Sequence, residues 1–387
     1  MRARPNLTAL TGVRWFAALH VLVFHLGQPM LVDAPQWVRN IGATGHVGVT
    51  LFFVLSGFIL AYTYFERTNW TAGSFWWARV ARIYPVYLLA FVLSAPHAVK
   101  EIFSSGVSVG PWLIAAASAV AALTLTQAWF PPFALLWNVP AWSLSVEAFF
   151  YFLFPWLARR ISRPEVSSTK LVLVGGMTWA AGLLVPALYT LCKSDGAGRP
   201  LDAETTGFWI TFLKYVPVAH LPEFVVGSVA GEIFLREVRS GVQRGAEILT
   251  PAITAALFVA LAFSTSIPYL LLHNGLLTPL FAVLVYSLAR ERSFVARFLA
   301  LPPLVLLGEA SYAVYLLHLQ LAWSTRLYAV VAPVVLRVPV LYFIGHVVPL
   351  TLACIAIYRW FEMPLRAWLR KIGPSSEASA TLSSERP

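Results

Sequence analysis

Long apolar runs separated by short polar connections dominate the pattern of the chain. A bilayer core about 30 Å thick requires roughly 20 mostly apolar residues for each spanning helix. Eleven candidate segments approach this length, at approximately 10–31, 46–65, 82–99, 111–129, 140–158, 170–191, 207–235, 248–267, 269–289, 303–332 and 338–361. The pattern therefore predicts an all-α integral membrane protein.

Two parts of the chain depart from this pattern. The seventh segment is too long for one crossing and contains Pro217 and Pro222, so we expect a break in the helix there. Residues 372–387, IGPSSEASATLSSERP, are rich in serine, alanine and proline and are typical of a disordered tail. We therefore expect one membrane domain over residues 1–371 and a disordered cytoplasmic tail over residues 372–387.

Arginine and lysine predict which connections face the cytoplasm, because basic residues accumulate on that side of a membrane. The basic clusters are Arg2/Arg4, Arg67/Arg79/Arg82, Arg159/Arg160/Arg163/Lys170, Arg236/Arg239/Arg244, Arg290/Arg292/Arg297 and Arg366/Arg370/Lys371. If all of them are cytoplasmic, an even number of crossings lies between Arg82 and Arg159, although three segments are available. We interpret 111–129 as a re-entrant or interfacial helix, because the loop after it carries no charge. The expected topology is about ten spanning helices with both termini in the cytoplasm.

The composition supports this class and excludes others. Hydrophobic residues make up 59% of the chain and charged residues 12%, whereas a soluble globular domain has about 25% charged residues. Basic cytoplasmic loops explain the net charge of +11, and no phosphate-binding loop, zinc spacing or nucleic-acid module is present, so nucleic acid is not an expected partner. Cys192 and Cys354 lie far apart and imply neither a disulfide framework nor a metal site.

The first segment, GVRWFAALHVLVFHLGQPM, carries three basic residues inside an apolar run. Eleven residues rotate an α-helix by about 1100°, roughly 20° beyond three full turns, and rise about 16 Å. Arg14 and His25 therefore share one face, whereas His20 lies about 140° round from His25. The alternative to a functional role for Arg14 is a side chain that extends to the lipid headgroups. For His25 the alternative is a buried histidine that is hydrogen-bonded to a neighbouring carbonyl. At the depth of His25, an ionisable residue usually marks a pathway or a site.

Polar residues also occur inside the second and fifth segments. Glu147 lies about 8 residues from the outer end of the fifth segment, roughly 12 Å deep, where a single carboxylate must be protonated or paired. Ser143 lies four residues earlier, on the same face. Ser56 lies near the middle of the second segment, and its alternative is an intrahelical bond to the carbonyl four residues before it. His46, at the outer end of that segment, is expected to be an interfacial residue rather than a ligand.

The tenth segment places three polar residues on one face. Ser311, Tyr315 and His318 occur at i, i+4 and i+7. Under the predicted topology His25, Glu147 and His318 lie at similar depths in three different helices. This coincidence is more than scattered charges would give, and it points to a polar site inside the membrane.

Two arginines just inside the cytoplasmic face allow two interpretations. The stretch FWWARVARIYPVY combines Arg79 and Arg82 with Trp76, Trp77 and Tyr84. A basic anchor beside an aromatic belt is the ordinary interpretation. The alternative is a phosphate site, because two guanidinium groups one helical turn apart can bind phosphate oxygens bidentately.

Seven stretches occur together and in one order, namely LTALTGVRWFAALHVLVFH, GVTLFFVLSGFIL, RVARIYPVYLL, WSLSVEAFFY, LPEFVVGSVAG, SYAVYLLHLQL and WFEMPLRAWL. Each is weak alone, but as a set they resemble the acyltransferase family 3 of integral membrane O-acyltransferases over nearly the whole chain. Members of this family transfer acyl groups, commonly acetyl, from coenzyme A thioesters to hydroxyls of carbohydrates or other acceptors. The resemblance implies a core of ten membrane helices, in agreement with the interpretation of the loop charges.

The resemblance also implies roles for individual residues. The essential arginine and histidine of the family fall on Arg14 and His25, and its helix-five carboxylate falls on Glu147, which gives the expected catalytic residues. The family's paired arginines, which are thought to hold the coenzyme, fall on Arg79 and Arg82. Arg14 is also expected to bind the coenzyme.

The family's Ser-Gly-Phe motif and its late tyrosine and histidine identify Ser56, Tyr315 and His318 as the expected substrate-binding residues. No metal and no permanently bound cofactor is implied, and acyl-coenzyme A is the expected donor. A hydroxyl acceptor and the lipid bilayer are the other expected partners, and a bacterial inner or plasma membrane is the expected location. Many family members carry a C-terminal SGNH-type hydrolase domain, whereas this chain stops near Lys371, so either it transfers directly or a separate partner completes the reaction.

The expected reaction begins with acyl-coenzyme A docked from the cytoplasm on the three arginines. Neutral His25 would remove the proton from an acceptor hydroxyl that attacks the thioester. Either Glu147 or His318 would orient or balance the charge of the imidazole. A covalent acyl-histidine intermediate remains an alternative to direct transfer.

Two other classes of function compete with this one. A transporter or flippase would use the buried polar residues as a substrate path, but no inverted repeat supports it. A membrane glycosyltransferase normally needs acidic clusters, and only 17 acidic residues occur, without a paired motif. The acceptor is left open among a cell-surface polysaccharide, a glycolipid and a glycosylated polyketide, as is the length of the acyl chain.

Overall fold

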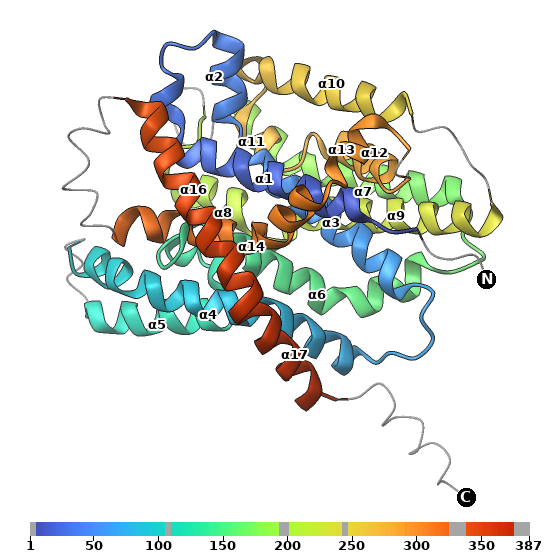
Figure 1. Ribbon diagram of the computed structural model, residues 1–387, viewed down its shortest axis with the longest axis horizontal. Coiled ribbons are helices and arrows are strands. Elements are labelled where there is room, and N and C mark those ends of the chain that lie inside the picture. The colour runs from blue at the N-terminus through green and yellow to red at the C-terminus, as the bar shows by residue number, and fades with distance from the viewer. Residues whose placement is uncertain are drawn as a thin grey trace, which may run out of the picture.

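The computed structural model describes residues 5–104, 110–192, 201–241, 247–290, 292–324 and 338–374. Across these ranges the chain forms helices and no strand, which confirms the all-α prediction. The α-helices are α1 (Thr8–Leu26), α2 (Gln36–Ala43), α3 (Val47–Tyr64), α4 (Ala72–Ser104), α5 (Pro111–Leu123), α6 (Trp142–Ile161), α7 (Ser168–Cys192), α8 (Phe208–Tyr215), α9 (Pro217–Ser240), α10 (Leu249–Ala262), α11 (Tyr269–His273), α12 (Thr278–Leu288), α13 (Phe294–Leu299), α14 (Pro302–Ser324), α16 (Pro339–Ile357) and α17 (Met363–Ile372). A π-helical turn, Tyr358–Glu362, joins α16 to α17 (Figure 1).

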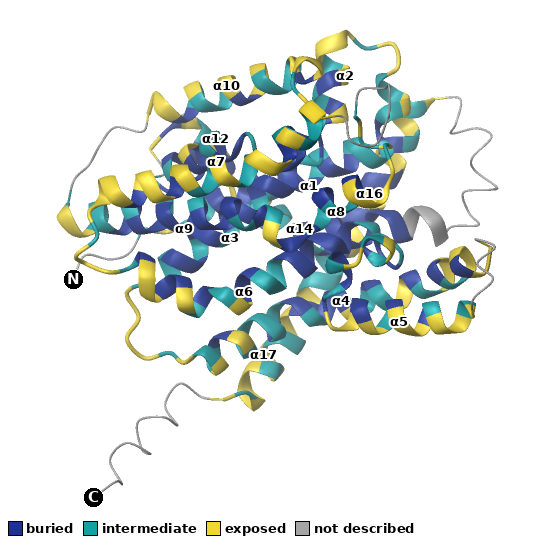
Figure 2. Cartoon of the chain, turned by 180° about the vertical axis from the view of Figure 1, so that it is seen from behind, coloured by how far each residue is buried: buried dark blue, intermediate teal, exposed yellow. Residues whose placement is uncertain are grey.

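Helices α1, α3, α9 and α14 form the buried centre of the bundle, and α7 and α10 lie outside it (Figure 2). The outer helices expose apolar side chains along much of their length. On α7, for example, Val172 is 56% exposed and Met177 is 63% exposed. Apolar surface of this extent is unfavourable in water and is accommodated by lipid. The exposure pattern therefore agrees with a multi-pass membrane protein.

Eight helices or helix pairs in the described ranges are long and apolar enough to cross a membrane. Helices α5 and α10 are shorter, with 13 and 14 residues, which corresponds to about 20 Å each and is less than the hydrocarbon thickness. The length of α5 agrees with the non-spanning interpretation of 111–129, but α10 was expected to span and is equally short. The count of ten spanning helices and the cytoplasmic termini therefore stay predictions.

The long seventh segment is broken where one of its prolines begins a new helix. Helix α8 ends at Tyr215, Val216 is extended with φ −60° and ψ 129°, and α9 begins at Pro217. A proline is favourable at the first position of a helix, because an N–H group at that position would have no acceptor within the helix and its absence costs nothing. Pro222 lies inside α9 without ending it, so the predicted break occurs at Pro217 alone.

The ends of two predicted regions lie partly outside the described residues. Helix α14 follows the tenth segment to Ser324, and the expected continuation to residue 332 lies outside the described ranges. Of the expected disordered tail, residues 375–387 also lie outside them.

Helices α3 and α9 approach so closely that glycines are required at their contact. A Cβ atom added to Gly57 would lie 2.2 Å from the carbonyl oxygen of Phe224, and one added to Gly227 would lie 2.2 Å from that of Val54. Both contacts are to backbone atoms, which cannot rotate away as a side chain does. Small residues that let helix backbones approach are a recurrent means of packing in membranes. This contact fixes the position of the α3 residues that line the site described below.

Gly227→Ala is expected to force α9 away from α3 and to lower the free energy of unfolding by about 1–3 kcal/mol. The measurement is the thermal unfolding midpoint of the purified protein in detergent. Gly176→Ala is the matched control, because a Cβ atom at Gly176 in α7 would meet nothing within 4 Å; there the substitution is neutral or stabilising. Equal midpoints for the two variants would contradict the close α3–α9 contact.

Candidate active site

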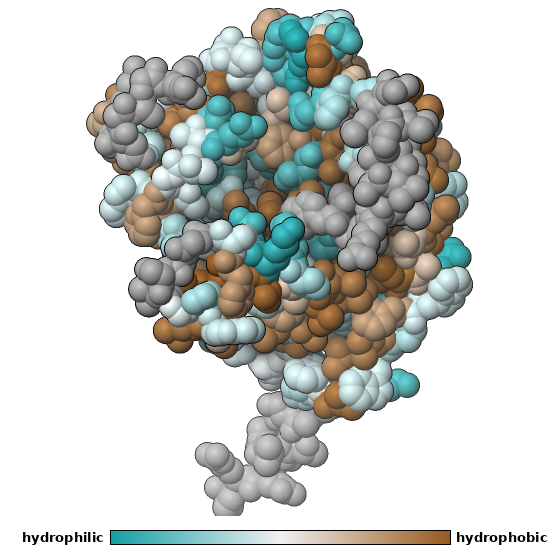
Figure 3. Space-filling view, turned by 90° about the vertical axis from the view of Figure 1, so that its left-hand side faces the viewer, coloured by the Kyte–Doolittle hydropathy of each residue, from teal (hydrophilic) through white to brown (hydrophobic). Residues whose placement is uncertain are grey.

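Two cavities of similar size lie at opposite ends of α1 and α3. The first, the basic cavity, has a volume of about 1110 Å³ and is bounded by the start of α1, the end of α3, the start of α4 and α17. The second, the histidine cavity, has a volume of about 1100 Å³ and is bounded by the end of α1, the start of α3, the start of α6 and α11. Figure 3 shows the end of the molecule that carries α2, where polar side chains surround a hollow. Because they use opposite ends of the same helices, the two cavities face opposite sides of the bundle.

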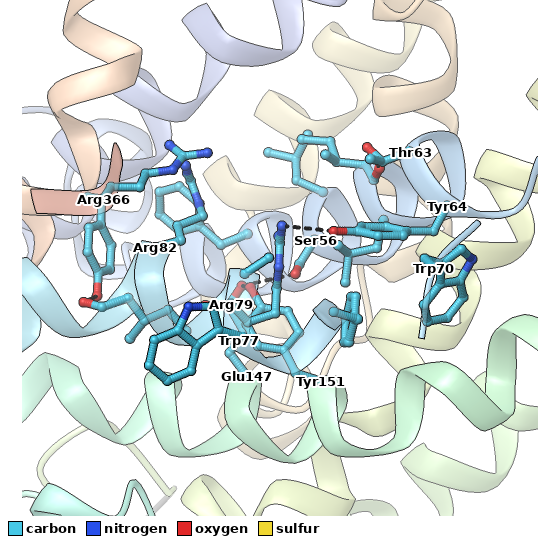
Figure 4. A pocket seen from close by; sticks show the side chains of 18 of the residues that line it. Ser56, Thr63, Tyr64, Trp70, Trp77, Arg79, Arg82, Glu147, Tyr151 and Arg366 are labelled. Carbon is cyan, nitrogen blue, oxygen red and sulfur yellow. Dashed lines mark hydrogen bonds between the residues drawn. The ribbon is translucent and has the colours of Figure 1, made fainter. Parts of the chain in front are cut away.

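The basic cavity is named for its arginines, and Figure 4 shows three of them together. Its charged lining residues are Arg14, Arg67, Arg79, Arg82, Arg366 and Arg370, with Glu66 and Glu147. Six arginines against two glutamates leave four uncompensated positive charges. Guanidinium groups at this density favour a polyanionic ligand.

Arg79 is held inside the cavity by aromatic rings. Its guanidinium lies 5.8 Å from the ring centre of Tyr64, 5.6 Å from that of Phe75 and 5.8 Å from that of Tyr151. One terminal nitrogen donates to the Tyr64 hydroxyl at 3.4 Å, while its buried Nε has no hydrogen-bond partner. Arg82, one turn later, lines the same cavity. Both side chains therefore face the cavity, as the phosphate-site interpretation requires.

Arg14 also lines the basic cavity from the start of α1. It is half-buried, and its charge interacts with those of Arg82, Glu362 and Glu147. The side chain thus takes part in the cavity, rather than following the alternative of extending to the headgroups.

Glu147 is paired through hydroxyl groups. Its Oε1 accepts a hydrogen bond from the Ser56 hydroxyl at 2.9 Å and a second one from the Tyr151 hydroxyl. Ser56 uses this partner in another helix instead of the alternative bond within its own. Tyr151 is a site residue that the sequence analysis missed, although its position four residues after Glu147 places both on one face of α6.

His25 and His318 form a hydrogen-bonded pair between α1 and α14. His318 Nδ1 lies 2.8 Å from the carbonyl oxygen of Tyr315 and must donate, so in the neutral ring its Nε2 is an acceptor. That Nε2 lies 3.1 Å from His25 Nδ1, which also lies 3.1 Å from the carbonyl oxygen of Val21. Both contacts place the proton of neutral His25 on Nδ1. The Nε2 of His25 then carries a lone pair at a residue that lines the histidine cavity.

Tyr315 and Val49 line both cavities, so the cavities meet at these residues. The hydroxyl of Tyr315 lies 2.8 Å from that of Ser143 and donates to the carbonyl oxygen of Pro140 at 3.0 Å. We call this group, Val49, Tyr315, Ser143 and Pro140, the septum. Ser311, which shares a face with Tyr315, donates instead to the carbonyl oxygen of Gly308 at 2.7 Å.

Among the expected site residues, the structure brings His25 to His318 and Glu147 to Ser56. Glu147 lines the basic cavity, whereas His25 lines the histidine cavity. Glu147 and His318 were the two partners considered for the imidazole of His25. In the structure His318 is the one that is hydrogen-bonded to it. Only the packing of α1 against α14 brings these two residues together, because they are 293 positions apart in the chain.

His20 and His46 have different surroundings. His20 Nε2 donates to the carbonyl oxygen of Ile41 at 2.6 Å and so attaches α2 to α1. His46 was expected to be interfacial, but it lines the histidine cavity and stacks on His273 with 5.5 Å between ring centres. Both nitrogens of His46 and the Nδ1 of His273 are buried without a hydrogen-bond partner. His273 was not among the site residues expected from the sequence, since nothing in the spacing relates the two histidines.

The rim of the histidine cavity is an ordered loop built on a buried lysine. Lys214 donates to the carbonyl oxygens of Asp202 and Ala203 at 3.1 Å and to that of Thr205 at 2.8 Å. Hydrogen bonds from Thr205 lower the pKa of Asp202 in this loop. Asp202 and Glu204 are the charged side chains that line this cavity. Its rim is therefore acidic, in contrast to the basic cavity.

Comparison with known proteins identifies the family to which the chain belongs. A family model described as an acyltransferase domain matches residues 7–359. Acyltransferase MdmB of Streptomyces mycarofaciens is 31% identical over 326 residues, which cover 81% of this chain and 78% of that protein. Exopolysaccharide production protein ExoZ of Rhizobium meliloti (strain 1021) is 29% identical over 351 residues, which cover 87% of this chain and 94% of that protein.

O-acetyltransferase OatA of Staphylococcus aureus (strain NCTC 8325 / PS 47) is 24% identical over 386 residues, which cover 93% of this chain and 57% of that protein. No solved structure matches the chain significantly. The family match extends over nearly the whole chain and includes the lining of both cavities except Arg366, Arg370 and Pro374. The chain therefore belongs to the acyltransferase 3 family and is a multi-pass membrane acyltransferase.

Proposed function

We propose that the chain transfers an acyl group from acyl-coenzyme A to a hydroxyl group of a carbohydrate or of a glycosylated natural product. One observation carries this proposal: an arginine-rich cavity and a cavity that presents an imidazole base meet at Tyr315. The first suits the phosphates of a coenzyme and the second suits an uncharged hydroxyl. Membership of an acyltransferase family favours this reaction over the transporter, flippase and glycosyltransferase alternatives.

The charge of the basic cavity matches that of coenzyme A. The 3′-phosphate monoester carries about −1.5 to −2 near neutral pH, and the two bridging phosphates add about −1 each, so the coenzyme balances the four uncompensated positive charges. We assign Arg79, Arg82 and Arg14 to the coenzyme. By the positive-inside rule this cavity faces the cytoplasm, where acyl-coenzyme A is made, and a bacterial plasma membrane fits this arrangement.

The pantetheine arm would extend from the arginines past Ser56 toward the septum. There the acceptor oxygen attacks the thioester carbonyl while the Nε2 of His25 takes the hydroxyl proton. Collapse of the tetrahedral intermediate breaks the carbon–sulfur bond and forms the ester. The coenzyme leaves as a thiolate and recovers the proton from the His25 imidazolium. No other reactant is needed, and the proton begins and ends on substrate atoms.

His318 is the proposed orienting residue for His25. Because the Nδ1 of His318 donates to the Tyr315 carbonyl oxygen, its Nε2 is the nitrogen that accepts. The donor to this Nε2 is the Nδ1 of His25, which therefore carries the proton. When His25 becomes protonated, the Nε2 of His318 still accepts the hydrogen bond from its Nδ1 and so stabilises the imidazolium, as the third residue of a triad does. Glu147 has a different proposed role, since it holds Ser56 and Tyr151 in the basic cavity and balances part of the charge of Arg14.

The histidine cavity is the proposed acceptor site. Trp142, Tyr215 and Tyr269 line it, and aromatic faces pack well against the apolar faces of sugar rings. One relative is named an exopolysaccharide production protein and another an O-acetyltransferase, which supports a carbohydrate hydroxyl as the acceptor. In this arrangement the acceptor binds on the side opposite the donor.

His25→Ala is expected to lower kcat by roughly 10²–10⁴-fold, because the base that removes the hydroxyl proton is lost. The measurement is the release of coenzyme A from acetyl-coenzyme A by protein in nanodiscs, with water in place of the acceptor. His20→Ala is the control on the same helix, since His20 serves the contact to α2. A folded His25→Ala protein with the wild-type rate would overturn the assignment.

The double variant Arg79→Ala/Arg82→Ala is expected to raise the KM for acetyl-coenzyme A by roughly 10–100-fold, since a hydrogen bond to a charged group contributes about 1.5–3 kcal/mol. The effect on kcat at saturating donor should be smaller. Arg159→Ala, at the end of α6 and outside the lining of the cavity, is the control for a general loss of basic charge. An unchanged KM would favour the anchor interpretation of the two arginines.

A further inference from the structure

Helix α17 packs against α4 (Figure 1), and both helices contribute to the lining of the basic cavity. The indole nitrogen of Trp77 donates to the carbonyl oxygen of Leu369 at 2.7 Å. A Cβ atom added to Gly373 would lie 1.9 Å from the same indole ring, so the end of α17 lies directly on Trp77. One tryptophan of α4 therefore fixes the position of α17.

This position directs two arginines of α17 toward the cavity. Arg366 and Arg370 lie one helical turn apart and line the basic cavity with Arg79 and Arg82. The charge of Arg366 interacts with those of all three others, and Figure 4 shows Arg366 beside Arg82. The Nε of Arg366 is buried and has no hydrogen-bond partner. Four guanidinium groups that face one space repel one another and are stabilised by an anion between them.

A carboxylate outside the lining of the cavity balances part of this charge, in addition to Glu66 and Glu147. Glu362 is 2% exposed and interacts with the charges of Arg82, Arg14 and Arg366. Its Oε2 is buried without a hydrogen-bond partner. Glu362 belongs to the π-helical turn before α17, and such turns are frequent at functional sites. The three carboxylates Glu66, Glu147 and Glu362 leave three of the six arginine charges unbalanced, which favours a further anion.

We propose that α17 forms part of the donor site and that Arg366 and Arg370 bind phosphate groups at the adenosine 3′,5′-bisphosphate end of the coenzyme. This proposal rests on the proposed function, since it takes acyl-coenzyme A as the donor. The reacting thioester lies at the septum, and the coenzyme is an elongated molecule. Its nucleotide end must therefore lie at the opposite side of the cavity, where Arg366 is half-buried and Arg370 is exposed.

Binding of adenosine 3′,5′-bisphosphate to the full-length protein in nanodiscs of zwitterionic lipid tests the assignment. Calorimetric titration should show that Arg366→Ala and Arg370→Ala each weaken binding by roughly 10-fold or more. Lys371→Ala is the matched control, because Lys371 belongs to the same helix but does not line the cavity. Wild-type affinity in both arginine variants would overturn the inference.

A kinetic comparison separates this inference from the proposed function. Arg366→Ala should raise the KM for acetyl-coenzyme A by roughly 10-fold but leave that for S-acetylpantetheine, which has no phosphate, unchanged. Loss of activity with both donors would contradict the inference. If the wild-type protein used neither donor and did not bind the bisphosphate, the proposed function itself would fail.

Anionic lipid headgroups offer the same phosphate chemistry to Arg366 and Arg370. The titration is therefore repeated in nanodiscs that contain phosphatidylglycerol. If the variants bound adenosine 3′,5′-bisphosphate as the wild type does and differed from it only in the anionic bilayer, the arginines would be a lipid site and the inference would be wrong.

Trp77→Phe tests whether the attachment of α17 matters for the donor. The variant keeps an aromatic ring but loses the hydrogen bond to Leu369, so α17 should be held less firmly. We expect the KM for acetyl-coenzyme A to rise about 3-fold or more, in line with the loss of about one hydrogen bond, with an unchanged KM for S-acetylpantetheine. Trp156→Phe, on the exposed side of α6, is the control, and equal KM values in the two variants would contradict a role for the attachment.

Discussion

The hydrogen bond between His25 and His318 depends on the packing of α1 against α14, and the rest of the site is arranged about this contact. The same two helices carry Arg14 into the basic cavity and Tyr315 into the septum. The close α3–α9 contact then fixes Ser56 against Glu147. The histidine pair, the septum and the basic cavity are thus positioned by helix packing.

The two cavities differ in charge in a way that suits two different substrates. One is lined by six arginines and the other by Asp202 and Glu204. A polyanion is attracted more strongly to the first than to the second, where the two carboxylates lie in a loop that also binds the ammonium group of Lys214. The aromatic rings around Arg79 strengthen this preference, because they screen its charge less than water does.

Much of the fold follows from the sequence, because apolar length and basic loops report directly on the bilayer. The helix break at Pro217 follows equally from the geometry of proline. The partner of His25 could not be chosen between Glu147 and His318, because residues in distant segments are brought together only by tertiary packing. The role of Arg366 was hidden for a related reason: its pattern is that of any cytoplasmic basic cluster, and only its neighbours in α4 distinguish it. The short α10 was missed because an apolar run does not show where its helix ends.

The septum has an electrical consequence. Water that enters both cavities would bring the two bulk solutions to within the thickness of a few side chains at Tyr315. The membrane potential would then fall mainly across this layer rather than across the whole bilayer, and each elementary charge that crosses 100 mV changes in energy by about 2.3 kcal/mol. His25 lies beside this layer, through its hydrogen bond to His318 three residues after Tyr315. A membrane acyltransferase built in this way has to resist leakage of ions across the septum, whatever group passes from one cavity to the other.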